Sequence, residues 1–333
     1  MKKKIAALKK PRRLLAHIGL NLAYKLRLKK APCLPTSIDI EPNNWCNFRC
    51  DHCQVTHWDK QKSDLDLEKF TYITNQFPNL RQVKVQGMGE PFLNKSTIGM
   101  LEYLDKKGVV SHTISNGSVL TEKLINRLSK LKLSSIGFSL DGGTKDTFEG
   151  IRIRGNFDKV TDNVKSLVAK APNLGAKFWV VVSQDNHHEC EEIVHLAKRL
   201  GVNKVTFQTF ITDWGKDEMT EKTSLISVND TNNDEQIKKA TEAGERIDVE
   251  VNRFKGYQFT TEKPCKWPWT SMMIDASGNV IPCCVIADSD TINFGNVFEQ
   301  KVEKIWNSLE YQDFRQSHTD GDIPDICKNC YAK

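Results

Sequence analysis

The sequence predicts an α/β fold with a mainly parallel sheet, followed by a small C-terminal α+β domain. From residue 37 to about residue 210, short β-branched runs alternate with amphipathic stretches, as in a series of βαβ units. After Pro264 the pattern changes to a short hairpin and a helix. Six strand–helix units are too few for the usual closed eight-fold barrel, and a partial barrel and an open sheet both fit. We predict a partial (β/α)6 TIM-type barrel.

The positions of the elements follow from the hydrophobic pattern. Strands are expected at residues 37–40, 82–86, 109–115, 135–140, 178–183 and 204–210. Amphipathic helices are expected between them, at residues 67–77, 98–107, 122–131, 157–169 and 189–200. The later part predicts a helix at about 235–247, a hairpin with strands at 272–274 and 280–281, and a helix near 301–309.

Changes in composition divide the chain into four predicted parts. Residues 1–36 form a basic helical arm, 37–211 the partial-barrel core, 212–262 a polar bridging helical segment, and 263–333 the C-terminal domain. The sequence shows no internal repeat and no low-complexity stretch. With 333 residues, one large domain plus a small appended one is the natural expectation.

Positive charge is concentrated in the N-terminal arm. Residues 1–36 hold eleven Lys and Arg and no Asp or Glu, so with a total of +6 the rest of the chain carries −5. Apolar residues recur in the arm at helical spacing: Leu14, Leu15, Ile18, Leu22 and Leu26. We interpret the arm as a solvated helix docked on the body, with weak contact to an anionic surface as the alternative. Without interleaved aromatic residues, it does not indicate nucleic-acid binding.

Cysteine usage points to metal or redox chemistry. No segment resembles a secretory signal or approaches the roughly 20 apolar residues of a membrane crossing, so we expect a cytoplasmic protein. Ten cysteines are many for a chain in a reducing compartment, where disulfides are rare. Cys33 and Cys190 stand alone and are interpreted as buried structural thiols. The other eight form two groups.

The first cysteine group is Cys46-Asn-Phe-Arg-Cys50-Asp-His-Cys53, a C-x3-C-x2-C pattern on the loop after the first strand. The carboxyl ends of parallel strands are where α/β folds place their chemistry. Three thiolates can bind three irons of a [4Fe–4S] cluster and leave the fourth iron open. The alternative is a zinc site completed by His52 or His57, although zinc ribbons favour C-x2-C pairs.

This pattern is similar to the signature of the radical S-adenosylmethionine (SAM) superfamily. Further matches follow at the ends of later expected strands. They are Gly87-Met88-Gly89-Glu90-Pro91, Ser115-Asn116-Gly117, Ser139-Leu140-Asp141-Gly142, and Arg152 in Ile151-Arg152. Each motif alone is common in turns and helix caps. Met88 departs from the strict Gly-Gly-Glu form of the family motif.

The resemblance implies a role for each of these residues. Gly87, Gly89 and Glu90 would hold the methionine amino group of SAM. Ser139 and Asp141 would contact the ribose and methionine, with Asn116 counted among the SAM-binding residues. Arg152 would meet the SAM carboxylate, and His52 would lie near the adenine. A carboxylate suits an ammonium group, and an arginine suits a carboxylate.

The second cysteine group resembles the opening of the SPASM extension found on many radical SAM enzymes. Its pattern is Cys265-x12-Gly278-x4-Cys283, followed by Cys327-x2-Cys330. Four thiolates complete one cluster, so the resemblance implies the shortened "twitch" form with a single auxiliary [4Fe–4S] cluster. Cys284 could replace Cys283 as the ligand, be an inert neighbour, or face the active site. Structural zinc is the alternative for the whole group.

The resemblance also implies a reaction class. In this family the reduced cluster cleaves SAM to a 5′-deoxyadenosyl radical, which abstracts a hydrogen atom from the substrate. We favour oxidation of a small sugar- or cyclitol-like alcohol, because the four-cysteine spacing is similar to that of 2-deoxy-scyllo-inosamine dehydrogenase-like enzymes. The alternatives are epimerisation with Cys284 or Cys190 as hydrogen donor, modification of a ribosomal peptide, and a non-catalytic metal-binding scaffold. A flavodoxin- or ferredoxin-type protein would supply electrons.

Overall fold

The computed structural model describes residues 11–214 and 216–331. These residues form two compact units, each built from separated segments of the chain. The first comprises residues 11–45, Gln61–His112 and 257–331. The second comprises Cys46–Lys60 and Thr113–Gly256. The boundary falls inside one strand, so that strand contributes to the sheets of both units.

The first unit is centred on strand β1 (Ser37–Ile40). Strands β2 (Gln82–Val85) and β8 (Ser271–Ile274) pair with it in parallel, one on each side. β2 also pairs in parallel with the first half of β3 (Val110–Ser115), and β8 forms an antiparallel hairpin with β9 (Val280–Ile281). The predicted C-terminal hairpin is therefore confirmed, and its first strand extends the parallel sheet.

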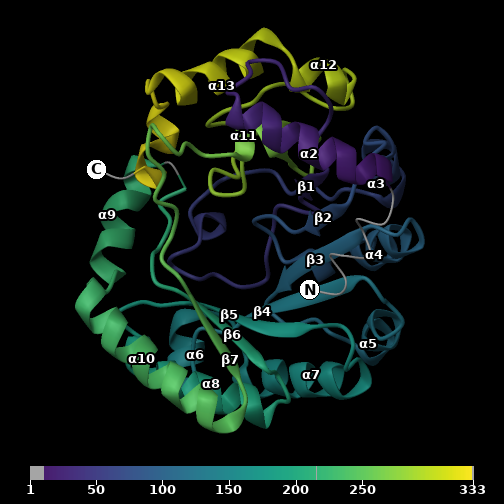
Figure 1. Cartoon of the computed structure of the whole chain (residues 1–333). Helices are drawn as coiled ribbons and strands as arrows, with labels where there is room; N and C mark the ends of the chain where they lie inside the picture. Colours follow the sequence, from purple (N-terminus) through teal and green to yellow (C-terminus); the bar gives the residue numbers. More distant parts are fainter. Residues whose placement is uncertain (1–10, 215, 332–333) are drawn as a thin grey trace. The chain divides into compact units, whose positions relative to one another are not determined.

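The helices of the first unit come from both ends of the described chain. They are α2 (Pro11–Lys25), α3 (Leu67–Asn75), α4 (Thr97–Lys106), α11 (Trp267–Thr270), α12 (Val302–Trp306) and α13 (Leu309–Asp320). Short 3-10 turns occur at Pro91–Leu93 and Asp325–Cys330. Figure 1 labels these elements along the chain.

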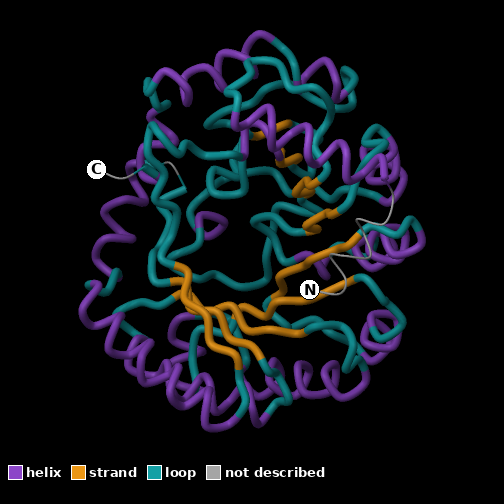
Figure 2. Tube along the Cα trace, in the orientation of Figure 1, coloured by secondary structure: helices purple, strands orange, loops and turns teal. Residues whose placement is uncertain are grey.

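The second unit is a run of parallel strands backed by helices. The second half of β3 is followed in the sheet by β4 (Ser134–Ser139), β5 (Ala176–Val181), β6 (Lys204–Gln208) and β7 (Glu250–Phe254). The helices are α5 (Glu122–Leu128), α6 (Lys145–Ile151), α7 (Phe157–Lys170), α8 (Cys190–Arg199), α9 (Asp217–Ile226) and α10 (Asp230–Ile247). The 3-10 turns are Gln54–Thr56 and His187–Glu189. Figure 1 shows α7, α8 and α10 along one side of these strands, which Figure 2 draws in orange.

The parallel α/β architecture is the one expected of a partial TIM barrel, and the predicted fold class is confirmed. Successive side chains of a strand point to opposite faces of a sheet. In β1 this places Ile38 and Ile40 on one face, where both are fully buried, and Asp39 on the other. Asp39 lies in register with Lys84 of β2, so charged groups meet on that second face.

Several elements were not expected from the sequence, among them the short helices α6 and α11, strand β7 and helix α13. Strand β7 lies inside the segment 212–262, which was predicted to be helical, and it pairs with β6. Its sequence, Glu-Val-Asn-Arg-Phe, is too polar to stand out as a strand. Helix α13 follows directly after the predicted helix near 301–309. The predicted boundaries at residues 36, 211 and 262 stay predictions.

Within residues 11–214 and 216–331, none of the helices combines the length and apolar character that a membrane crossing requires.

Candidate functional site

The loop that carries the first cysteine group is shaped by its own backbone. The Cys53 amide donates to the Cys50 carbonyl at 3.0 Å, and the Thr56 hydroxyl donates to the same carbonyl at 2.8 Å. Arg49 donates through Nη1 to the carbonyls of Cys46 and Phe48, both at 2.8 Å. These hydrogen bonds hold the three cysteines on one compact loop.

Hydrogen-bond donors point at all three sulfurs, and the donor to Cys53 is the Val55 amide. Asn116 Nδ2 lies 3.7 Å from Cys46 Sγ, and the Phe48 amide lies 3.4 Å from the same sulfur. Arg152 Nη1 lies 3.8 Å from Cys50 Sγ. Donors of this kind stabilise negative charge on thiolate ligands and tune the metal group that they hold.

The charge state of these cysteines depends on a bound cation. Burial raises the pKa of the Cys50 thiol, and the Arg152 guanidinium opposes that rise. Burial, together with the neighbouring Cys50, raises the pKa of the Cys53 thiol to about 12. Such buried thiols ionise readily only when a metal takes the proton's place. Three sulfurs with adjacent N–H donors therefore fit a [4Fe–4S] cluster with one open iron.

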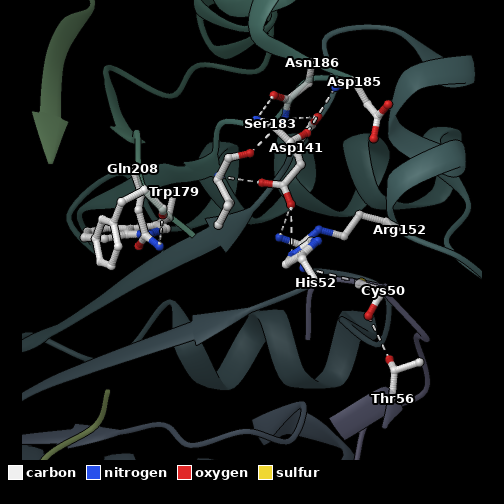
Figure 3. A network of polar contacts seen from close by, with 12 residues as sticks. Cys50, His52, Thr56, Asp141, Arg152, Trp179, Ser183, Asp185, Asn186 and Gln208 are labelled. Atoms are coloured by element: carbon white, nitrogen blue, oxygen red, sulfur yellow. Dashed lines mark hydrogen bonds and ion pairs between the residues drawn. The ribbon is translucent and has the colours of Figure 1, made fainter. Parts of the chain in front are cut away.

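A buried ion pair lies beside this loop. Arg152 Nη2 is 2.5 Å from Asp141 Oδ2, and His52 Nε2 is 3.8 Å from the same oxygen. Asp141 is fully buried, at 0% exposure. Figure 3 shows the Asp141 carboxylate directed at Arg152 and His52. The structure thus brings together three residues that the sequence assigned to SAM binding, and in the structure the arginine's carboxylate partner is Asp141.

The His52 imidazole is held in its neutral form. Burial, and then the positive charge of Arg152, lower the pKa of His52 to about 4. Although Asp141 acts in the opposite direction, it does not outweigh these two effects. At neutral pH this side chain is therefore a flat, uncharged ring, which suits contact with an adenine.

Asp141 is itself fixed by the end of strand β5. Its Oδ1 accepts from the Val181 amide at 2.8 Å, and its carbonyl accepts from Asn186 Nδ2 at 2.8 Å. Ser139, the last residue of β4, lies in register with Trp179, whose indole donates to Gln208 at 3.1 Å. Sequence reasoning missed Asn186. Its place in the turn Ser183-Gln-Asp-Asn186 was the only signal available, because asparagine is frequent in turns.

The Gly-Met-Gly-Glu loop packs tightly on the end of β1. Glu41 Oε1 accepts from the Met88 amide at 2.8 Å, and a Cβ at Gly87 would stand 2.2 Å from Glu41 Cγ. A Cβ at Gly89 would stand 2.4 Å from the Asn43 carbonyl oxygen. Both glycines are therefore required by close approach. Glu90 accepts from the Phe92 amide at 3.2 Å.

Glu41 is a second residue that the sequence analysis missed. It is 3% exposed, and its Oε2 also accepts from the Ala276 amide at 3.2 Å. One buried carboxylate thus ties the loop after β2 to the turn after β8. No local motif identifies it, because its two partners lie far away in the sequence.

The second cysteine group comes together in the first unit. Burial raises the pKa of Cys265 to about 12, and Cys283 and Cys330 add to the rise through their charges. Burial likewise raises the pKa of Cys327, with contributions from Cys283, Cys265 and Cys330. Four thiols thus lie within electrostatic reach of one another. Four thiolates complete one iron–sulfur cluster, and the assignment of these four cysteines to such a cluster stays a prediction.

Cys284 adjoins this group and also contacts Asp39. Its thiol hydrogen-bonds to Asp39, a contact that lowers the carboxyl pKa, whereas burial has the larger effect and raises it to about 6. Lys84 Nζ lies 3.5 Å from Asp39 Oδ2. The charge of Cys283 raises the pKa of Cys284, and the charge of Asp39 raises the pKa of Cys283, so the two adjacent thiols share this environment. The structure thus gathers Cys284, Asp39 and Lys84 on the polar face of β1 and β2.

Cys190 is the first residue of α8 and is 1% exposed. Burial raises its pKa to about 12, and the neighbouring Glu189 adds to the rise. These surroundings agree with an inert structural thiol, as the sequence suggested. Its alternative role as a hydrogen donor stays a prediction.

Comparison with known proteins agrees with this geometry. Residues 40–197 match the radical SAM superfamily, and residues 265–331 match SPASM, an iron–sulfur cluster-binding domain. A Pyrococcus furiosus tungsten-containing aldehyde ferredoxin oxidoreductase cofactor-modifying protein is 24% identical over 325 residues, covering 86% of this chain and 87% of that protein.

Two solved structures show similar folds. Streptococcus suis SuiB bound to the precursor peptide SuiA has a TM-score of 0.70 at 14% identity, covering 88% of this chain and 69% of that one. BtrN in complex with AdoMet and 2-DOIA has a TM-score of 0.52 at 17% identity, covering 89% of this chain and 92% of that one.

The fold and the two cysteine groups define an iron–sulfur protein built on a partial α/β barrel. The chain belongs to the radical SAM superfamily and carries a C-terminal SPASM iron–sulfur domain. It is a radical SAM enzyme, whose cofactors are SAM and a [4Fe–4S] cluster. This family membership excludes the alternative of a non-catalytic metal-binding scaffold.

The buried ion pair leads to a stability prediction. Replacing Asp141 with Asn leaves the buried Arg152 without its counter-charge, which should cost about 3–5 kcal/mol. Urea unfolding of Asp141→Asn, Arg152→Gln and the double variant should give a coupling energy of at least about 1 kcal/mol between the two sites. Additive effects within about 0.5 kcal/mol would contradict a direct pair.

Proposed function

We propose that this enzyme oxidises a small polar molecule, a sugar- or cyclitol-like alcohol, with the help of one auxiliary [4Fe–4S] cluster. The observation that carries the proposal is the grouping of the C-terminal cysteines. Cys265, Cys283, Cys327 and Cys330 lie within electrostatic reach of one another, and Cys284, which adjoins Cys283, also hydrogen-bonds to Asp39. Four protein ligands would fill every iron of a cluster and leave none for substrate.

The residues of the first group would hold the SAM-binding cluster through Cys46, Cys50 and Cys53. When bound, SAM and the two clusters supply a radical that removes a hydrogen atom and a centre that accepts an electron. Gly87, Gly89 and Glu90 would bind the methionine amino group. Asn116, Ser139 and Asp141 would orient the remainder of SAM, Arg152 would meet its carboxylate, and neutral His52 would lie against the adenine.

Asp39 is our candidate for the proton acceptor. Conversion of a secondary alcohol to a ketone removes one hydrogen atom, one electron and one proton. Asp39 is 2% exposed, and its carboxylate accepts from Lys84 and from the Cys284 thiol. Lys84 lies 3.5 Å away and keeps about a third of its side chain exposed, at 33%. We infer that the pair receives the substrate hydroxyl, with Asp39 taking the proton and Lys84 orienting the oxygen.

One neighbour with a bound small molecule supports a small substrate. BtrN, solved with 2-DOIA, is matched over 92% of its length. SuiB, solved with a peptide, is matched over 69%. A peptide substrate is the second candidate, because peptide-maturing proteins such as Bacillus subtilis AlbA also match, at 23% identity. Epimerisation with Cys284 as donor is the third, because its thiol already contacts Asp39.

The assignment of the auxiliary ligands predicts different outcomes for two adjacent cysteines. Anaerobically reconstituted wild type should hold about eight irons per chain, as expected for two [4Fe–4S] clusters. Cys283→Ala should lose roughly half of that iron, whereas Cys284→Ala should keep it. Iron analysis and Mössbauer spectra measure both. If Cys284→Ala loses iron and Cys283→Ala retains it, Cys284 is the cluster ligand and Cys283 is not.

The reaction class predicts a pattern of isotope transfer. With sugar and cyclitol alcohols deuterated at the carbinol carbon, turnover should place deuterium in 5′-deoxyadenosine and give one ketone per 5′-deoxyadenosine. Asp39→Asn should lower ketone formation at least about tenfold, within the range that positioned acid–base groups contribute. Retained iron would show that this variant still binds its clusters.

Solvent deuterium at the carbinol carbon of an alcohol with inverted configuration would indicate epimerisation instead. Turnover only with peptides, and with none of the alcohols, would contradict the small-substrate proposal.

A further inference from the structure

Helix α2 presents its apolar residues outward. Of the twelve large hydrophobic side chains that are exposed among the described residues, six lie between residues 14 and 28. They are Leu14 at 40%, Leu15 at 66%, Ile18 at 53%, Leu22 at 52%, Leu26 at 60% and Leu28 at 43% exposure. The first five are spaced so that they share one face of the helix. We call these five residues the α2 stripe.

The opposite face of α2 is fixed to the first unit. Arg13, Ala16, Leu20 and Ala23 are its buried residues. Arg13 Nη1 donates to the Gly108 carbonyl at 2.6 Å, and the Tyr24 hydroxyl donates to the Pro264 carbonyl at 2.9 Å. Since the helix is held on this side, the stripe cannot turn inward without breaking these contacts. The sequence interpretation of a docked helix is correct, and the apolar stripe is its outer face.

The charges around the stripe are of one sign. Residues 1–36 contain eleven Lys and Arg and no acidic residue, while the rest of the chain is net negative. Arg12, Lys25, Lys29 and Lys30 are exposed in the described part of this segment. An apolar stripe flanked by cations has the composition of a helix that lies in the interface of an anionic bilayer.

We propose that the α2 stripe docks this enzyme on the surface of an anionic phospholipid membrane. The leucines and Ile18 enter the boundary between headgroups and acyl chains, and the flanking cations meet the lipid phosphates. A second copy of this chain is a poorer occupant, because two such faces would bring their cations together. The proposal is independent of which substrate the enzyme oxidises.

Vesicle co-sedimentation tests this docking. The full-length protein should bind vesicles of phosphatidylglycerol and phosphatidylcholine at low salt, bind pure phosphatidylcholine at least tenfold more weakly, and be partly released by salt. The double variant Leu15→Glu/Leu22→Glu should lose at least tenfold in partitioning. The matched control is Leu225→Glu/Leu309→Glu, which alters two leucines elsewhere that are 74% and 73% exposed, and it should bind as wild type does.

Thermal melts and iron content of the variants establish that they are folded. Equal partitioning of the stripe variant and the control, or no binding of wild type to anionic vesicles, would overturn the proposal. It would also be overturned if light scattering showed a wild-type dimer that the stripe variant abolishes, because the stripe would then be an interface between copies.

Discussion

The ion pair between Arg152 and Asp141 is the interaction on which the chemistry of the second unit depends. It is buried, so neither charge is stable without the other. Asp141 is in turn held by the Val181 amide at the end of β5, while Arg152 reaches the sulfur of Cys50. One contact therefore connects two strand ends to the cysteine loop. Burial, together with the positive charge of Arg152, keeps the neighbouring His52 neutral.

The first unit is organised by a buried carboxylate and a set of thiols. Glu41 joins the glycine-rich loop after β2 to the turn after β8, and β8 is a strand of the C-terminal domain. The pKa values of Cys265 and Cys327 are raised, so these thiols need a cation to ionise, and metal binding and the packing of this region are coupled. The thiol of Cys284 lies beside Cys283 and hydrogen-bonds to Asp39.

Much of the fold and of the candidate site could be predicted from the sequence, because strands, glycine-rich turns and cysteine spacings are short-range features. Strands β1 to β6 and the C-terminal hairpin lie where periodicity placed them, within about two residues. The contacts of Glu41, Asn186 and Asp39 were not readable, because they join residues that are distant in sequence or depend on which face of a strand is polar. Strand β7 was hidden by its polar composition. For α2, periodicity identified the apolar stripe but could not show that a different face is buried.

The central claim is that Cys46, Cys50 and Cys53 support reductive cleavage of SAM. The most direct test is to reconstitute the protein anaerobically with iron and sulfide, add SAM and dithionite, and quantify 5′-deoxyadenosine beside the Cys50→Ala variant. The account predicts formation by the wild type and none by the variant. A wild-type protein that binds zinc in place of iron and forms no 5′-deoxyadenosine would contradict it.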